Sequence, residues 1–246
     1  MTEPSKSKVI VEAEGIVKVL GSAPNEIKVL KGIDLQLQTG ELTLMMGPSG
    51  SGKTTLLSVL GCILSPTQGK LTISGMKTHN MNKEQLANLR RKHVGFVFQS
   101  YNLVPTLSAV ENVMLALDLR DLNGPDAYDQ AADALEAVGL GHRIKAMPSK
   151  MSGGEKQRVS IARALAGSPS VILADEPTAA LDAKNGMAVM ELLAKVGQDS
   201  HRAVLAVTHD HRTLQYADRI VTIDDGRIAG SERPKLTGKS VEMAAH

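Results

Sequence analysis

The sequence predicts an α/β fold in which a mostly parallel sheet is covered by helices, with a helical insertion near residues 100–150. Three observations indicate this fold. Short apolar runs alternate with amphipathic ones along the 246 residues. A glycine-rich turn joins the apolar run Leu42–Met46 to the helical pattern of Thr55–Leu60. From Ser108 to about Leu140 the pattern becomes helical.

Each element follows from its apolar periodicity and from the turn residues that separate the runs. Strands are predicted where short apolar runs are bounded by turn signals such as Thr39-Gly40. They are Val9–Val11, Ile33–Leu37, Leu42–Met46, Lys70–Ser74, Val94–Phe98, Val171–Ala174, Ala203–Thr208 and Arg219–Ile223. Helices are predicted where apolar residues recur at helical spacing. They are Thr55–Leu60, Lys83–Lys92, the region from Ser108 to about Leu140, Ser152–Ala166 and Ala183–Val196.

The predicted organisation is one domain over residues 9–230, with a helical subdomain at about 100–160. Polar tails are predicted at residues 1–8 and 231–246, the second of them loosely ordered. Neither an internal repeat nor a low-complexity segment is evident.

Composition narrows the class of protein. The formal net charge is +2, so no strong electrostatic attraction to nucleic acid or acidic lipid is expected. A single cysteine, Cys62, excludes an intramolecular disulfide framework and fits a reducing compartment. The first residues lack the apolar core of a signal peptide, and no apolar run reaches the roughly 18 residues that span a bilayer. We therefore expect a cytoplasmic chain that is soluble by itself.

The segment Gly47–Thr54 reads GPSGSGKT and fits the phosphate-binding pattern G-x-x-x-x-G-K-[ST]. Its glycines let the backbone curl so that successive N–H groups point at phosphate oxygens. Lys53 adds a positive charge for the β- and γ-phosphates, and the Thr54 hydroxyl can bind Mg²⁺. The alternative is a chance glycine-rich turn, but the flanking strand and helix are the context that the motif requires. The predicted nucleotide-binding residues are Gly47, Pro48, Ser49, Gly50, Ser51, Gly52, Lys53, Thr54 and Thr55.

Two acidic residues, Asp175 and Glu176, end the apolar run that begins at Val171. Adjacent carboxylates at the end of a buried strand need solvent or a cation. Asp175 is the candidate ligand of Mg²⁺, and Glu176 is the candidate general base that polarises an attacking water. An ordinary strand-to-turn junction also favours Asp and Glu, so the phosphate-binding motif upstream is what favours the functional interpretation.

The segment Met151–Arg158 reads MSGGEKQR, and Ser152 with Glu155 forms a predicted capping box. Gly153 and Gly154 therefore lie in the first turn of a helix, where glycine is poor helix material. Their use makes sense if another group must approach that backbone closely. A helix start with free N–H groups and a serine hydroxyl is an anion site; the alternative is a helix start merely softened by glycine.

Together these motifs resemble the nucleotide-binding subunit of an ATP-binding cassette (ABC) transporter. The resemblance covers about residues 9–230. It rests on six motifs in the family's order: GPSGSGKT, Gln99 of the Q-loop, the MSGGEKQR signature, VILADEP, Leu181-Asp182 of the D-loop and His209 in VTHD. It implies a P-loop NTPase fold of the ABC ATPase type, with a mixed sheet core, an N-terminal β-subdomain and an inserted α-helical subdomain.

The resemblance also implies a mechanism that uses ATP and Mg²⁺. Two copies meet head to tail and enclose two ATP molecules, each between the phosphate loop of one copy and the signature of the other. His209 contacts the γ-phosphate and positions the water held by Glu176, while Gln99 contacts Mg²⁺ or that water. Asp182 orders the site across the dimer interface. The signature residues are Ser152, Gly153, Gly154 and Glu155, and the implied metal ligands are Thr54, Gln99 and Asp175.

One departure from the family's pattern concerns the nucleotide base. The family usually places an aromatic residue near position 20 to stack on adenine, but no aromatic residue precedes Phe96 here. We expect Leu20, with Val19, to pack on the purine by dispersion alone and to give weak discrimination between bases. Met151 also replaces the usual leucine of the signature, an apolar exchange that is tolerated.

The resemblance implies partners in a membrane. Separate transmembrane permease subunits would hold the chain at the cytoplasmic face of the inner membrane and dock at Phe98–Thr106. Three segments, Leu60–Cys62, Pro66–Gly69 and Gly95–Gln99, look most like the lipoprotein-releasing and macrolide-efflux subfamily, which moves lipid, lipoprotein or drug-like cargo. The ATPase of an amino-acid-type importer is the alternative. A soluble ABC ATPase acting on nucleic acid is disfavoured, because the sequence has no basic, aromatic-interleaved patch.

Overall fold

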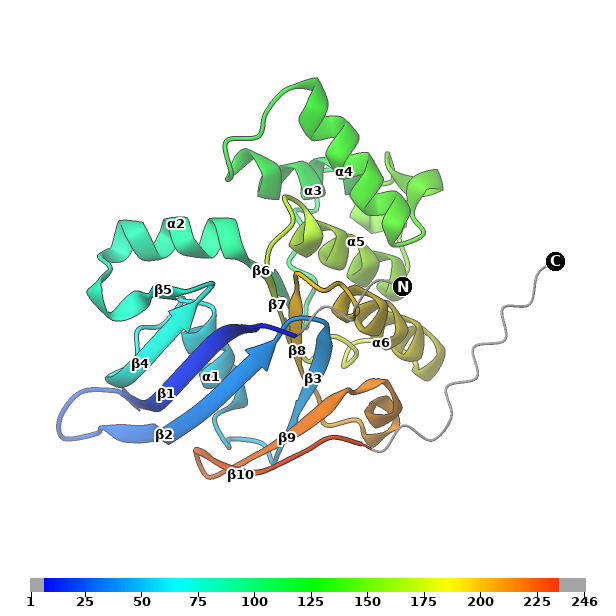
Figure 1. Cartoon of the computed structure of the whole chain (residues 1–246). Helices are drawn as coiled ribbons and strands as arrows, with labels where there is room; N and C mark the ends of the chain where they lie inside the picture. The colour runs from blue at the N-terminus through cyan, green and yellow to red at the C-terminus, as the bar shows by residue number, and fades with distance from the viewer. Residues whose placement is uncertain (1–6, 235–246) are drawn as a thin grey trace, which may run out of the picture.

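The computed structural model describes residues 7–234, which form two sheets and the helices packed on them (Figure 1). The strands are β1 (Val9–Leu20), β2 (Ile27–Gln38), β3 (Glu41–Met46), β4 (Gln68–Ile73), β5 (Met76–Lys77), β6 (Val94–Val97), β7 (Val171–Asp175), β8 (Ala203–Val207), β9 (Arg219–Asp224) and β10 (Arg227–Glu232). The α-helices are α1 (Lys53–Leu60), α2 (Lys83–His93), α3 (Ala109–Asp118), α4 (Pro125–Ala137), α5 (Gly153–Leu165) and α6 (Ala183–Gly197). Short 3₁₀ turns lie at Thr78–Asn80, Gly141–Arg143, Pro148–Lys150 and His211–Tyr216.

The central sheet has six strands in the order β10-β9-β3-β8-β7-β6. Strands β9, β3, β8, β7 and β6 run parallel, and only the edge strand β10 is antiparallel to its neighbour. All residues of β3 and β8 are buried, as expected for strands covered on both faces. The prediction of a mixed α/β core is therefore confirmed.

Strand β3 shows how the sheet divides the core into two layers. Leu42, Leu44 and Met46 belong to one buried cluster, which includes apolar residues of α3 to α6. Met45 belongs to the other, with apolar residues of α1 and of the N-terminal strands. Alternate residues of a strand point to opposite faces, so this single strand anchors both layers.

The second sheet is antiparallel, with the order β2-β1-β4-β5, and forms the N-terminal β-subdomain. Strands β1 and β2 are each 12 residues long, much longer than the predicted Val9–Val11 and Ile33–Leu37. The extra length is half exposed and irregular. The β1–β2 register shifts between Ala13 and Ile16, around Gly15 at φ +57°, which breaks the alternation that sequence reasoning relies on.

Helices α3, α4 and α5 pack together above the central sheet in Figure 1 and form the helical part of the insertion. The predicted continuous helical region from Ser108 to about Leu140 is interrupted between α3 and α4. Asp121 and Gly124 adopt left-handed conformations, and Pro125 occupies the first position of α4. Proline is favoured there because its missing N–H would have no helical partner.

Strand β10 extends two residues past the predicted domain boundary at Gly230. Ser231 and Glu232 of β10, a strand that the sequence analysis did not predict, pair with Val221 and Ile220 of β9, so these two residues of the predicted tail belong to the sheet. Beyond it, Arg233 lies 2.7 Å from the buried Glu41 carboxylate. Residues 1–6 and 235–246 of the predicted tails lie outside the described residues. Across residues 7–234, the structure contains no helix with the length and apolarity required to cross a bilayer.

Candidate active site

The candidate site lies at one edge of the central sheet, where the parallel strands end. The phosphate loop follows β3, Gln99 lies two residues past β6, Asp175 ends β7, and His209 lies two residues past β8. Neighbouring parallel strands present their carboxyl ends at the same edge, so the sheet brings together residues that are far apart in sequence.

Lys53 and the glycines fix the shape of the phosphate loop. Lys53 Nζ donates to the carbonyl oxygens of Gly47 and Pro48, at 2.9 and 2.7 Å. A Cβ on Gly47 would lie 2.0 Å from the Ile223 carbonyl oxygen, so only glycine fits at that position. Gly52 has φ +102° and caps α1, which begins at Lys53, two residues earlier than predicted. The first N–H groups of α1 therefore face the loop, as an anion site requires.

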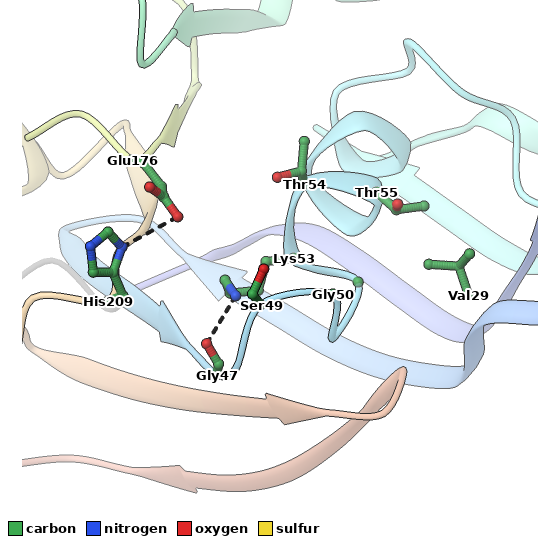
Figure 2. Close-up of a pocket in the computed structure, with 10 residues that line it drawn as sticks. Val29, Gly47, Ser49, Gly50, Lys53, Thr54, Thr55, Glu176 and His209 are labelled. Carbon is green, nitrogen blue, oxygen red and sulfur yellow. Dashed lines mark hydrogen bonds and ion pairs between the residues drawn. The ribbon is translucent and has the colours of Figure 1, made fainter. Parts of the chain in front are cut away.

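A pocket of about 540 Å³ opens over this loop (Figure 2). Its volume lies in the range of small-molecule sites. Its lining contains most of the predicted phosphate loop together with Glu176 and His209, which come much later in the sequence. The lining residues are Val29, Gly47, Ser49, Gly50, Gly52, Lys53, Thr54, Thr55, Glu176 and His209.

Asp175 lies beside Thr54, at the end of the phosphate loop. Burial raises the pKa of Asp175, although a hydrogen bond from the Thr54 hydroxyl and the charge of Lys53 act in the other direction. Thr54 Oγ1 lies 3.3 Å from Asp175 Oδ1. A hydroxyl and a carboxylate oxygen are hard oxygen donors, so this pair fits Mg²⁺.

Glu176 lies one residue past β7 in a left-handed conformation, with φ +45°. Its N–H donates to the Val207 carbonyl oxygen at 3.0 Å, which fixes the backbone against β8. The side chain points toward His209, whose Nδ1 lies 3.4 Å from Glu176 Oε1 (Figure 2). These two residues come from adjacent strands and face the pocket as a pair.

The predicted capping box at the start of α5 is present. Ser152 Oγ accepts from the Glu155 N–H at 3.2 Å, and Glu155 Oε2 accepts from the Ser152 N–H at 2.8 Å. Arg143 donates to the other carboxylate oxygen of Glu155 at 3.0 Å. The backbone hydrogen bond from Ser152 lowers the pKa of Glu155, and Arg143 lowers it further. The exposed Ser152 hydroxyl therefore sits at a fixed helix start.

The glycines of that helix start have packing partners in their own chain. A Cβ on Gly154 would lie 2.5 Å from Asn185 Oδ1, and one on Gly153 would lie 3.0 Å from the Tyr101 hydroxyl. Asn185 in turn donates through both nitrogens to Asp182, at 2.9 and 2.7 Å. Asp182 is thus the N-cap of α6, and its backbone bond from Asn185 lowers its pKa.

A family model described as "ABC transporter" matches residues 30–179 of this chain. This chain belongs to the ABC transporter family. The matched segment, 150 of the 246 residues, begins in β2 and ends just past Glu176, so it spans the phosphate loop, the signature and both acidic residues.

Relatives of two architectures share this ABC cassette. The macrolide export ATP-binding/permease protein MacB of Shewanella sp. is 41% identical over 97% of this chain, which spans 37% of that protein's length. The uncharacterised ABC transporter ATP-binding protein MJ0796 of Methanocaldococcus jannaschii is 39% identical over 91% of this chain and 97% of its own length. A dimeric structure of MJ0796 bound to ADP and Pi superposes with a TM-score of 0.83 at 38% identity, covering 93% of this chain and all of that one.

The cassette brings together only part of the predicted site within one chain. Loop residues, Glu176 and His209 share the pocket, and Asp175 joins them through Thr54. Among the described residues, Gln99, Ser152 and Asp182 are exposed and do not line this pocket. Pro48 and Ser51 belong to the loop but do not line the pocket either.

Sequence reasoning missed several residues that shape the site. Leu20 is 37% exposed at the far end of β1 and does not line the described pocket, whereas Val29 of β2 does. Neither Asn185 nor Tyr101 carries a motif that would have marked it as a neighbour of the signature. The position of Val29 in the pocket lining follows from the full length of β2, which the predicted strand Ile33–Leu37 did not include.

Proposed function

We propose that this ABC cassette hydrolyses ATP as a head-to-tail dimer and drives a membrane-spanning partner. The observation that carries the proposal is the pocket in which the lysine loop faces Glu176 and His209 while the Ser152 tip remains outside it. One chain therefore supplies a phosphate site and a base but leaves an exposed anion-binding tip for a second copy. The structure of a dimeric relative bound to ADP and Pi supports a dimer and ATP hydrolysis.

The chemistry is divided among the named side chains. Lys53 and the first N–H groups of α1 bind the phosphates, and Glu176 accepts a proton from the attacking water. His209 keeps the Glu176 carboxylate and that water oriented. Mg²⁺, held by Thr54 and Asp175 with Gln99 as a further ligand, would neutralise charge on the β- and γ-phosphates. The Ser152 tip of the other copy stabilises the charge that develops on the γ-phosphate.

The proposed membrane partner docks where the chain follows β6. A groove of about 430 Å³ lies there, with a largely apolar floor formed by Ile63, Phe96, Phe98, Leu115 and Leu119. Exposed apolar residues concentrated around one groove are typical of an interaction site. The similarity to the macrolide export protein MacB supports export driven through permease subunits. By the subfamily resemblance, the proposed cargo is a lipid, lipoprotein or drug-like molecule, and this chain lies at the cytoplasmic membrane face.

A mixing experiment tests the dimer. In a head-to-tail sandwich, each site combines the phosphate loop of one copy with the tip of the other. Lys53→Ala and Ser152→Asp should each abolish phosphate release when present in both copies. The aspartate still caps α5 but repels the γ-phosphate. Mixing the two variants should restore activity, because each mixed dimer contains one site with both parts intact.

Two controls sharpen this test. Equal amounts of both variants should reach about a quarter of wild-type activity, because half of the dimers are mixed and each keeps one of two sites. Covalently linking two Lys53→Ala copies should restore nothing. Mixtures that stay inactive while nucleotide still binds to Ser152→Asp would refute the sandwich.

A further inference from the structure

Tyr101 lies close to three parts of this cassette that are far apart in the sequence: the segment after Gln99, the signature tip and the D-loop. It lies two residues past Gln99, in the segment that also forms the proposed docking groove. Its hydroxyl donates to the Ala180 carbonyl oxygen, beside the D-loop, at 3.4 Å. A Cβ on Gly153 would lie 3.0 Å from the same hydroxyl and 3.2 Å from Leu181. The tyrosine side chain therefore lies between the signature tip and the D-loop.

The backbone around Tyr101 is held in a conformation that it would not adopt freely. Tyr101 and Asn102 are consecutive left-handed residues, with φ of +61° and +50°. Non-glycine residues seldom adopt this conformation, and two in a row require fixed partners. The Arg163 guanidinium supplies them, donating to the carbonyl oxygens of Tyr101 and Asn102 at 2.7 and 2.5 Å.

Arg163 also joins the docking groove to the signature helix. Its side chain lines the groove together with Asn102 and Phe98. Its backbone belongs to α5, the helix that starts at the signature tip. Burial lowers the pKa of Arg163, and none of the ion pairs in the described part of the chain includes it. The two carbonyl oxygens are thus its main polar partners.

We propose that Tyr101 is a positioning residue through which the docking groove controls the surface that closes over the second copy's ATP. This inference rests on the proposed dimer and adds its regulation. A partner that fills the groove contacts Arg163 and Asn102, which line it. Movement of these groups changes the Tyr101 backbone, and the tyrosine ring moves the signature tip and the D-loop together. Gly153 fits this role, because a Cβ at that position would lie 3.0 Å from the Tyr101 hydroxyl and press on it.

The test measures ATP-driven dimerisation and ATP binding separately. All variants carry Glu176→Gln, which blocks hydrolysis, and dimer formation is followed by sedimentation as ATP is added. We expect Tyr101→Ala to raise the ATP concentration for half-dimerisation about tenfold. Nucleotide affinity of the dilute monomer should change less than about twofold, since Tyr101 does not line the phosphate pocket. Tyr101→Phe keeps the ring but loses the hydroxyl that contacts Ala180 and lies beside Gly153, so it should give an increase smaller than that of Tyr101→Ala. Tyr128→Ala on α4 is the matched control.

A second variant keeps the inference falsifiable if Tyr101→Ala does not fold. Arg163→Lys leaves the tyrosine ring in place but cannot hold both carbonyl oxygens, so it should weaken dimerisation in the same direction. Where the double variant folds, it should be no worse than the stronger single one, because both act on one element. Additive effects, or normal dimerisation of Arg163→Lys, would overturn the role of Tyr101. If the Glu176→Gln parent itself fails to dimerise with ATP, the sandwich is refuted and this role falls with it.

Discussion

Replacing Glu176 with glutamine separates the chemical step from nearly everything else that this side chain does. Glutamine has almost the same shape, so the backbone of Glu176, held to Val207 at 3.0 Å, should not move. The pair with His209 spans 3.4 Å and its histidine side chain is 68% exposed, so its loss should cost less than about 1 kcal/mol of folding stability. A general base contributes roughly 10²–10⁴-fold to a rate, or about 3–5 kcal/mol of barrier.

The substitution should therefore raise the activation free energy several times more than it lowers the free energy of unfolding. Two measurements separate these effects. Phosphate release under saturating ATP should fall by about 10²–10⁴-fold in Glu176→Gln. The thermal unfolding midpoint should stay within a few degrees of the wild type. ATP should accumulate unhydrolysed in a closed dimer. Glu191→Gln, an exposed carboxylate on α6, is the control and should leave both quantities unchanged. Turnover within about threefold of the wild type would refute the assignment of Glu176 as the base.

Three further predictions follow from individual contacts. Gly154→Ala should destabilise the fold by about 1–3 kcal/mol in chemical unfolding, because its Cβ would lie 2.5 Å from Asn185 Oδ1; an equal cost in an Asn185→Ala background would contradict this reasoning. Burial raises the pKa of Cys62 to about 11, so its alkylation at pH 8 should be at least about 100-fold slower in the folded chain than in guanidinium, and equal rates would show that the thiol is accessible. If Val29 or Leu20 contacts the purine only by dispersion, ATP and GTP should differ in kcat/KM by less than about tenfold. A strong preference for ATP would show that other contacts also recognise the base.

The elements that sequence reasoning predicted well are those whose pattern is decided by burial. Strand β3 is buried along its whole length, so its apolar run, Leu42–Met46, defined it to within one residue. The capping box of Ser152 and Glu155 is equally local, because both partners lie within four residues. The phosphate loop combines local glycine geometry with an apolar strand before it. In each case, the information needed lies within a few residues of the feature.

Features that depend on distant contacts were not predictable in this way. The outer halves of β1 and β2 are stabilised by pairing with each other across an irregular register rather than by an apolar face. β10 continues to Glu232 because β9 offers backbone partners, although its own composition is polar. The lining of the phosphate pocket depends on the length of β2, which is why Val29, which lines it, was not predicted. The contact of Leu20 with the purine stays a prediction.

If the signature tip acts on the ATP of a second copy, as proposed, its glycines show how such a site is prepared by its own chain. Sequence reasoning attributed Gly153 and Gly154 to the approach of a phosphate from outside. The structure adds Tyr101 and Asn185, which occupy the space that side chains at these positions would fill. In the proposed dimer, these contacts would order the tip before the second copy arrives, so that less conformational entropy is lost on closure. If the glycines were required only because a phosphate approaches them, replacing Tyr101 or Asn185 would leave closure of the dimer unchanged. Because the tip is already packed against both, closure should depend on residues that never touch ATP.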